Sequence, residues 1–114
     1  MSVTVARVYD PPTADRVFVD RLWPRGIRKD DPRIGRWCKD VAPSNELRSW
    51  YHANRDQYEV FAARYREELT GGPAASALGE LRELASAGDV EIATAAKDVE
   101  HSHVPVIVAA LRSS

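Results

Sequence analysis

The most promising candidates for chemistry lie in a run of charged and aromatic side chains over residues 20–29. The run reads Asp-Arg-Leu-Trp-Pro-Arg-Gly-Ile-Arg-Lys and directly follows an apolar stretch that is typical of a strand. Arginine binds phosphate or carboxylate through paired hydrogen bonds, and an indole ring stacks on a base or a guanidinium. Arg21, Trp23 and Arg25 are therefore candidate ligand-binding residues, and Asp20 is a candidate catalytic acid or base. The alternative is a surface turn with an internal Asp20–Arg ion pair and a tryptophan that belongs to the core.

A second run of polar side chains, residues 95–103, also follows a strand-like stretch and precedes a helix. Lys97 is a candidate anion clamp near the start of that helix, and Asp98 and His101 are candidate acid–base residues. The alternative roles are a solvated charge for Lys97 and a helix cap for Asp98. Asp98, His101 and His103 would need a remote further ligand to hold a metal, so we predict no metal site.

Three stretches have the pattern of strands: residues 3–8, 16–20 and 90–96. The second is almost continuously apolar, which predicts a central strand buried on both faces. Only about six residues separate the first two stretches, so these strands are antiparallel or are not neighbours. Ligands of open α/β sheets bind at the carboxyl ends of strands. Because each polar run follows a strand, we expect a crevice between the ends of the second and third strands.

Capping residues and apolar stripes predict four helices. Ser44 is a good N-cap for the first, Asn54 with Gln57 fits a capping box for the second, and the last should start near residues 101–103. The stripes are Leu47, Trp50 and Tyr51; Tyr58, Phe61, Tyr65 and Leu69; Leu78, Leu81, Leu84 and Ala85; and Val104, Ile107, Val108 and Leu111. Residues 21–43 have no clear period, which is typical of a long ordered loop with a functional role.

The order strand, strand, long loop, three helices, strand, helix predicts an α/β fold. We expect a small mixed sheet flanked by helices, in a single domain that covers residues 1–114. The 114 residues include 44 % hydrophobic and 29 % charged side chains, values close to globular averages.

The net charge of −1 hides an uneven distribution of charged residues. Residues 21–40 hold seven basic and three acidic side chains, and the rest of the chain holds nine basic and fourteen acidic. This argues against a protein that is basic all over, but it is compatible with one locally basic site.

The sequence also predicts a cytoplasmic location without a membrane partner. No apolar run approaches the roughly 20 residues of a membrane span, and the first residues do not have the pattern of a signal peptide. The single cysteine, Cys38, excludes an internal disulfide and a CxxC redox pair. The residues indicate no particular cofactor, and they leave the oligomeric state open.

Several motifs together resemble one known family. They lie at residues 7–12 (RVYDPP), 16–26 (RVFVDRLWPRG), 37–44 (WCKDVAPS), 47–50 (LRSW), 61–69 and 95–101. Over nearly its whole length the chain resembles the YeaO-like branch of the domain of unknown function 488 family. The resemblance implies a small cytoplasmic α/β protein without an agreed activity.

The resemblance also bears on mechanism. Related members outside this branch carry a cysteine and a Cys-His-Arg run near the last strand, where this chain has Lys97, Asp98 and His101. A mechanism that depends on a thiol is therefore not expected. Some members of the branch carry transcription-regulator labels, but the chain shows no helix-turn-helix with a basic recognition helix.

From these residues we expect the protein to bind a small anionic ligand, bearing phosphate or carboxylate, in the predicted crevice. Acid–base catalysis through Asp20, Asp98 or His101 is left open, and so is whether the protein is an enzyme. The alternative is a nucleic-acid-binding or transcription-regulatory module that uses the basic loop, residues 21–40. A structural or protein-partner role is a third hypothesis.

Overall fold

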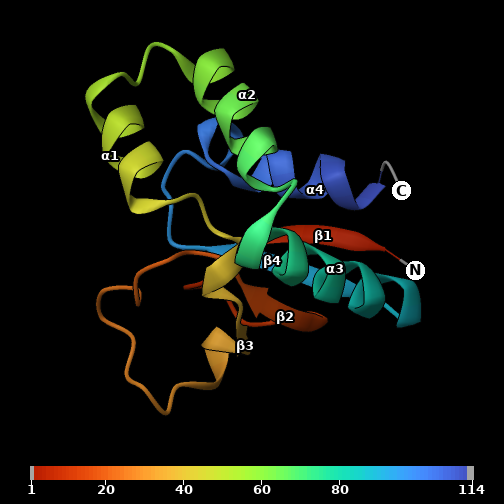
Figure 1. The fold of residues 1–114 in the computed structure, drawn as a ribbon. Coiled ribbons are helices and arrows are strands. Elements are labelled where there is room, and N and C mark those ends of the chain that lie inside the picture. Colours follow the sequence, from red (N-terminus) through yellow and green to blue (C-terminus); the bar gives the residue numbers. More distant parts are fainter. Residues whose placement is uncertain (1, 113–114) are drawn as a thin grey trace.

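The computed structural model describes residues 2–112, which contain a four-stranded sheet and four α-helices (Figure 1). The strands are β1 (Val3–Arg7), β2 (Asp15–Phe18), β3 (Arg36–Trp37) and β4 (Val90–Thr94), and their spatial order is β1-β4-β2-β3. Every described pair of strands is parallel. The predicted α/β class is confirmed, but the sheet is parallel rather than mixed.

Strand β4 lies between the two N-terminal strands. Val5 of β1 and Val17 of β2 are both opposite Ile92 of β4. Strands β1 and β2 are therefore not neighbours, which is one of the two arrangements that their short connection predicts. The segment that connects them returns along the sheet, and Val8 is buried there against Phe18 of β2.

The four helices supply the main hydrophobic core on one face of the sheet. They are α1 (Asn45–Ala53), α2 (Tyr58–Glu68), α3 (Gly72–Ala87) and α4 (Val104–Arg112). Strand residues of alternating position, such as Val90 and Ile92 of β4, pack with helix residues such as Phe61 and Ile107. This alternation is expected, because successive side chains of a strand point to opposite faces.

Local capping signals account for some of the helix boundaries. The predicted N-cap is confirmed, because the Ser44 hydroxyl accepts a hydrogen bond of 3.1 Å from the backbone N–H of Leu47. The capping box predicted at Asn54 and Gln57 does not form, since α2 begins at Tyr58 without a side-chain cap. The last helix begins at Val104, after the short 3₁₀ helix η3 (Val99–His101).

The long segment after β2 covers the other face of the sheet. It contains two 3₁₀ helices, η1 (Pro32–Ile34) and η2 (Lys39–Val41), and the two-residue strand β3. Ile27 and Ile34 pack there against Phe18. Strand β2 is thus buried on both faces, as predicted, whereas β3 is too short to be predicted from periodicity.

A buried ion pair joins this covering layer to the sheet. Arg16 Nε lies 2.7 Å from Glu91 Oε1, and the two side chains are only 1 % and 3 % exposed. Arg16 Nη1 also donates to the backbone carbonyls of Val8 and Arg33, and Thr13 donates to Glu91.

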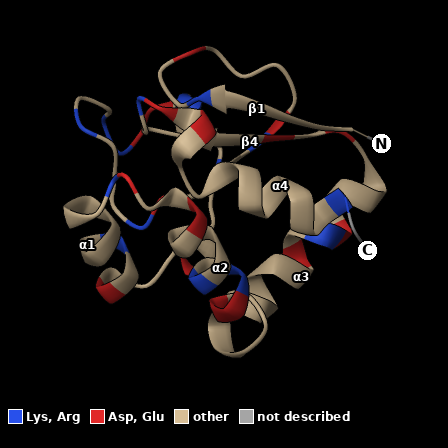
Figure 2. Ribbon diagram, turned by 90° about the horizontal axis from the view of Figure 1, so that it is seen from above, with Lys and Arg blue, Asp and Glu red and all other residues tan. Residues whose placement is uncertain are grey.

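Several basic residues lie at one end of the molecule, whereas others lie on α2, α3 and α4 (Figure 2). In Figure 2 the Lys and Arg segments gather in the loops beside α1, on the side toward which β1 points. That side carries the carboxyl ends of the parallel strands. Among residues 2–112, none of the helices has the length and apolar character needed to span a membrane.

Candidate functional site

A cavity of about 620 Å³ opens at the carboxyl ends of β2 and β4, a size typical of small-molecule sites. Its walls come from the segments that follow these two strands, from the residues before and within α1, and from the segment before α4. We call it the carboxyl-edge cavity. All the predicted site residues line it: Asp20, Arg21, Trp23, Arg25, Lys97, Asp98 and His101. They converge because β2 and β4 are adjacent and parallel.

Asp20 lies in the floor of this cavity and joins the ends of the two strands. Its Oδ1 accepts a hydrogen bond of 2.6 Å from the Thr94 hydroxyl, and its Oδ2 accepts one of 2.9 Å from the backbone N–H of Ala95. Burial alone would raise the pKa of the Asp20 carboxyl, but hydrogen bonding and charge from His103 help to lower it below its ordinary value. Asp20 is therefore a carboxylate whose oxygens are already occupied, which makes it a poor general base.

His103 is a floor residue that the sequence did not assign to ligand binding. Its Nε2 lies 3.1 Å from Asp20 Oδ1 and 3.1 Å from the backbone carbonyl oxygen of Val19. Sequence reasoning considered this residue only as a metal ligand, and the residues that the structure describes contain no cluster that could hold a metal. Its position in the sequence could have indicated this place in the site, because residues between β4 and the next helix follow the carboxyl end of the strand.

Asp98 and His101 form a second pair, at the rim of the cavity. His101 Nδ1 lies 2.9 Å from Asp98 Oδ2, and both side chains are more than half exposed. Asp98 also caps η3, since its Oδ1 accepts from the backbone N–H of His101. The capping role that was the alternative for Asp98 is thus present. The two residues remain open to solvent and to a ligand.

Arg21 holds the cavity wall in place. Its guanidinium donates to the carbonyl oxygens of Pro43 (3.0 Å) and Ala42 (3.1 Å), just before α1. Asp20 pairs with His103 and not with an arginine, so the internal Asp20–Arg ion pair considered as an alternative is absent from residues 2–112.

Trp23 is part of the wall rather than a free stacking platform. Its indole N–H donates to the carbonyl oxygen of Ile27 (2.6 Å), across a turn in which Gly26 has a φ of 79°. Its ring also lies edge-on to Trp37, with the ring centroids 5.3 Å apart. These contacts fix the orientation of the ring, so they favour the structural role that was its alternative.

Three cations at the cavity have no partner within residues 2–112. The side chains of Arg25, Arg48 and Lys97 make no hydrogen bond or ion pair there, and all three are exposed. A fourth cation, Arg55, lies over the ring of Tyr51 at 4.8 Å. The carboxylates of Asp20 and Asp98 are both engaged with other groups, so the cavity carries uncompensated positive charge.

A second hollow, of about 750 Å³, lies between β3 and α3. It mixes the basic residues Arg36 and Lys39 with Asp40, Glu80 and Glu83, and it contains none of the predicted site residues. Its mixed charge does not favour a ligand of either sign.

Comparison with known proteins places the chain in a family. The sequence model described as "Inactive DUF488-N3 subclade" matches residues 2–114. The chain is 53 % identical over 108 residues to an uncharacterized protein of Mycobacterium tuberculosis, covering 92 % of this chain and 89 % of that protein. It is 34 % identical over 116 residues to the uncharacterized protein YeaO of Escherichia coli, covering 99 % of each. No solved structure gives a significant match.

Proposed function

Because the chain belongs to the inactive DUF488-N3 subclade, we propose that it binds a small anion bearing phosphate or carboxylate in the carboxyl-edge cavity and does not turn it over. The observation that carries this proposal is the set of three unpaired cations, Arg25, Arg48 and Lys97, at one cavity whose own carboxylates are engaged. They belong to three different segments, so a ligand between them would be held from several sides. Guanidinium and ammonium groups are the usual partners of phosphate and carboxylate.

The same contacts favour binding over catalysis. A general base must be able to reach the proton that it removes and must have a pKa suited to the task. Asp20 already accepts hydrogen bonds from Thr94 and Ala95. Burial alone would raise the pKa of the Asp20 carboxyl, but the hydrogen bonds to His103, Thr94 and Ala95 help to lower it below its ordinary value. One carboxylate oxygen of Asp98 caps η3, and the other is hydrogen-bonded to the His101 ring.

The nucleic-acid alternative receives less support from the basic loop. Arg33 is bound to Asp31 at 2.7 Å and to the carbonyl of Tyr9, and Arg28 lies 3.6 Å from Asp30. These side chains are therefore partly neutralised within the loop. If the loop did bind nucleic acid, affinity for a single-stranded oligonucleotide would fall steeply between low and high salt.

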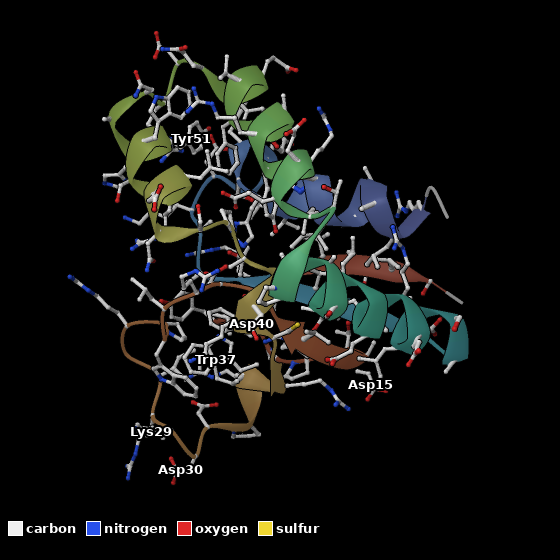
Figure 3. The ribbon with its side chains drawn as sticks, viewed as in Figure 1. Asp15, Lys29, Asp30, Trp37, Asp40 and Tyr51 are labelled. Carbon is white, nitrogen blue, oxygen red and sulfur yellow. The ribbon has the colours of Figure 1, made fainter. Side chains whose placement is uncertain are left out.

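The test is isothermal titration calorimetry with inorganic phosphate and with succinate. We expect saturable binding by the wild type and an affinity about tenfold or more lower in the triple variant R25Q/R48Q/K97Q, because each hydrogen bond between charged groups contributes roughly 1.5–3 kcal/mol. The matched control is K29Q/R36Q/R66Q, which removes the same charge from residues that do not line the cavity. Lys29, for example, points outward at the tip of the long loop (Figure 3).

The outcomes separate the hypotheses. A loss confined to the cavity variant supports the proposal. Absence of saturable binding to both probes, or an equal loss in the two triple variants, would overturn it. Formation of a new product during incubation with either ligand would show turnover and contradict the non-catalytic part.

A further inference from the structure

The floor of the carboxyl-edge cavity holds an imidazole against two fixed acceptors. His103 Nε2 is 3.1 Å from Asp20 Oδ1 and 3.1 Å from the carbonyl oxygen of Val19. Neither a carboxylate nor a carbonyl oxygen can donate, so Nε2 carries a hydrogen in both the neutral and the charged ring. Gain and loss of a proton therefore take place at Nδ1, which has no hydrogen-bond partner within residues 2–112.

The protonation of this ring sets the charge of the floor. Asp20 is held as a carboxylate by the Thr94 hydroxyl and the Ala95 N–H. With a neutral imidazole the His103–Asp20 pair carries a full negative charge, and with an imidazolium it carries none. The His103 side chain is 13 % exposed, so this charge is only weakly screened by water. An anion entering the cavity is repelled by the first state and not by the second.

Several other titratable and charged groups surround His103 and the cavity. From α2, Tyr65 packs against the ring with its centroid 6.2 Å away, and Glu68 lies beyond it near Ser44. The remaining titratable and charged groups that line the cavity are Arg21, Arg25, Arg48, His52, Arg55, Lys97, Asp98 and His101. Cations are in excess among them.

We propose that His103 is a binding determinant of this cavity, because an anionic ligand selects its imidazolium form and binding takes up one proton from solvent at Nδ1. This rests on the proposed function, since it requires that an anion binds. Ligand affinity then rises as the pH falls through the range in which histidine titrates. By the same linkage, a bound anion stabilises the charged ring.

The probe is sulfate, which remains a dianion throughout the range from about pH 6 to 8, where histidine titrates. Calorimetry at several pH values, each in two buffers of different ionisation enthalpy, gives both the affinity and the number of protons taken up. We expect net uptake of protons on sulfate binding, up to one proton per sulfate. On the alkaline side we expect the affinity to fall by up to about tenfold per pH unit, as linkage to one proton requires.

The decisive variant is His103→Gln, which keeps an N–H donor toward Val19 and Asp20 but cannot take up a proton. We expect weaker sulfate binding in which both the proton uptake and the pH dependence are lost. The matched control is His52→Gln, at another histidine that lines the cavity, and it should retain the proton uptake. Equal loss of uptake in both variants, or unchanged uptake in His103→Gln, would overturn the assignment.

A measurement on the wild type keeps the proposal testable if His103→Gln does not fold. In ¹⁵N NMR spectra of the histidine rings at neutral pH, saturating sulfate should shift the Nδ1 resonance of His103 toward its imidazolium value. Sulfate binding without this shift and without pH dependence would overturn the role of His103 and leave the anion site intact. Failure of sulfate, phosphate and succinate alike to bind at any pH would instead overturn the proposed function itself.

Discussion

Strands β2 and β4 carry two charged clusters that are built on opposite principles. In the middle of the sheet, Arg16 and Glu91 are almost fully buried and bound to each other, and both make further hydrogen bonds to the protein. At the carboxyl edge, by contrast, Arg25 and Lys97 are exposed and have no partner within residues 2–112. Charges that are neutralised internally hold the covering layer on the sheet, whereas unpaired charges around a hollow remain available to a ligand.

The largest effect on stability is expected from Glu91→Gln. This change leaves the Arg16 guanidinium buried without its counter-charge, which typically costs about 3–5 kcal/mol of unfolding free energy. Urea unfolding followed by circular dichroism measures the loss. The control is Glu59→Gln on the exposed surface of α2, which should change stability by no more than about 0.5 kcal/mol. Similar losses in the two variants would show that the buried pair does not hold the layers together.

The second prediction concerns a close backbone contact between Gly35 and Arg16, the arginine of the buried ion pair. Gly35 has a φ of 64°, and a Cβ at this position would lie 2.4 Å from the carbonyl oxygen of Arg16. Gly35→Ala should therefore cost more than the roughly 1–2 kcal/mol of the left-handed backbone conformation alone. Gly26→Ala is a matched control, because Gly26 has a φ of 79° but nothing within 4 Å of a new Cβ. Equal melting temperatures for the two variants would contradict the close approach of the layers.

The third prediction concerns Asp20, a charge of the cavity that Thr94, Ala95 and His103 engage together. Asp20→Asn should cost about 1–3 kcal/mol at neutral pH, because an amide cannot accept from Thr94, Ala95 and His103 together. Since the pKa of Asp20 is lowered in the folded state, its contribution is complete above the ordinary value of 3.8 and is lost as the pH falls through the folded value. The difference between wild type and variant should thus shrink below about pH 4. A difference that stays constant down to pH 2 would contradict this role.

How much the sequence can predict depends on the range of the interactions involved. The Ser44 cap and the apolar stripes act within a few residues, so they correctly predict where the four α-helices lie in the sequence. The convergence of residues 20–25 with residues 97–101 follows from one general rule, that ligand sites of α/β sheets lie at the carboxyl ends of strands.

Several features that escaped prediction depend on partners distant in the sequence. Strand β3 exists because Arg36 and Trp37 pair with β2, and two residues are too few to show a period. Arg21 is suited to bind an anion, but its donors are used by carbonyl groups more than 20 residues away. The role of His103 depends on Asp20, more than 80 residues earlier in the chain. The type of a side chain shows which hydrogen bonds and ion pairs it can form. Only the fold determines which of these it forms within the protein.

The smallest stability effect is expected at the cavity cations, which completes the contrast with the buried cluster. Removing three exposed charges of the same sign from one cavity relieves repulsion, so R25Q/R48Q/K97Q should be as stable as the wild type or more stable by a few tenths of a kcal/mol. Adding sulfate should raise the melting temperature of the wild type but not of this variant, because only a protein that binds the anion is stabilised by it. A variant destabilised as much as Glu91→Gln would show that these cations support the fold. Unchanged stability with lost stabilisation by sulfate would mean that the charges at the edge of the sheet serve the ligand rather than the fold.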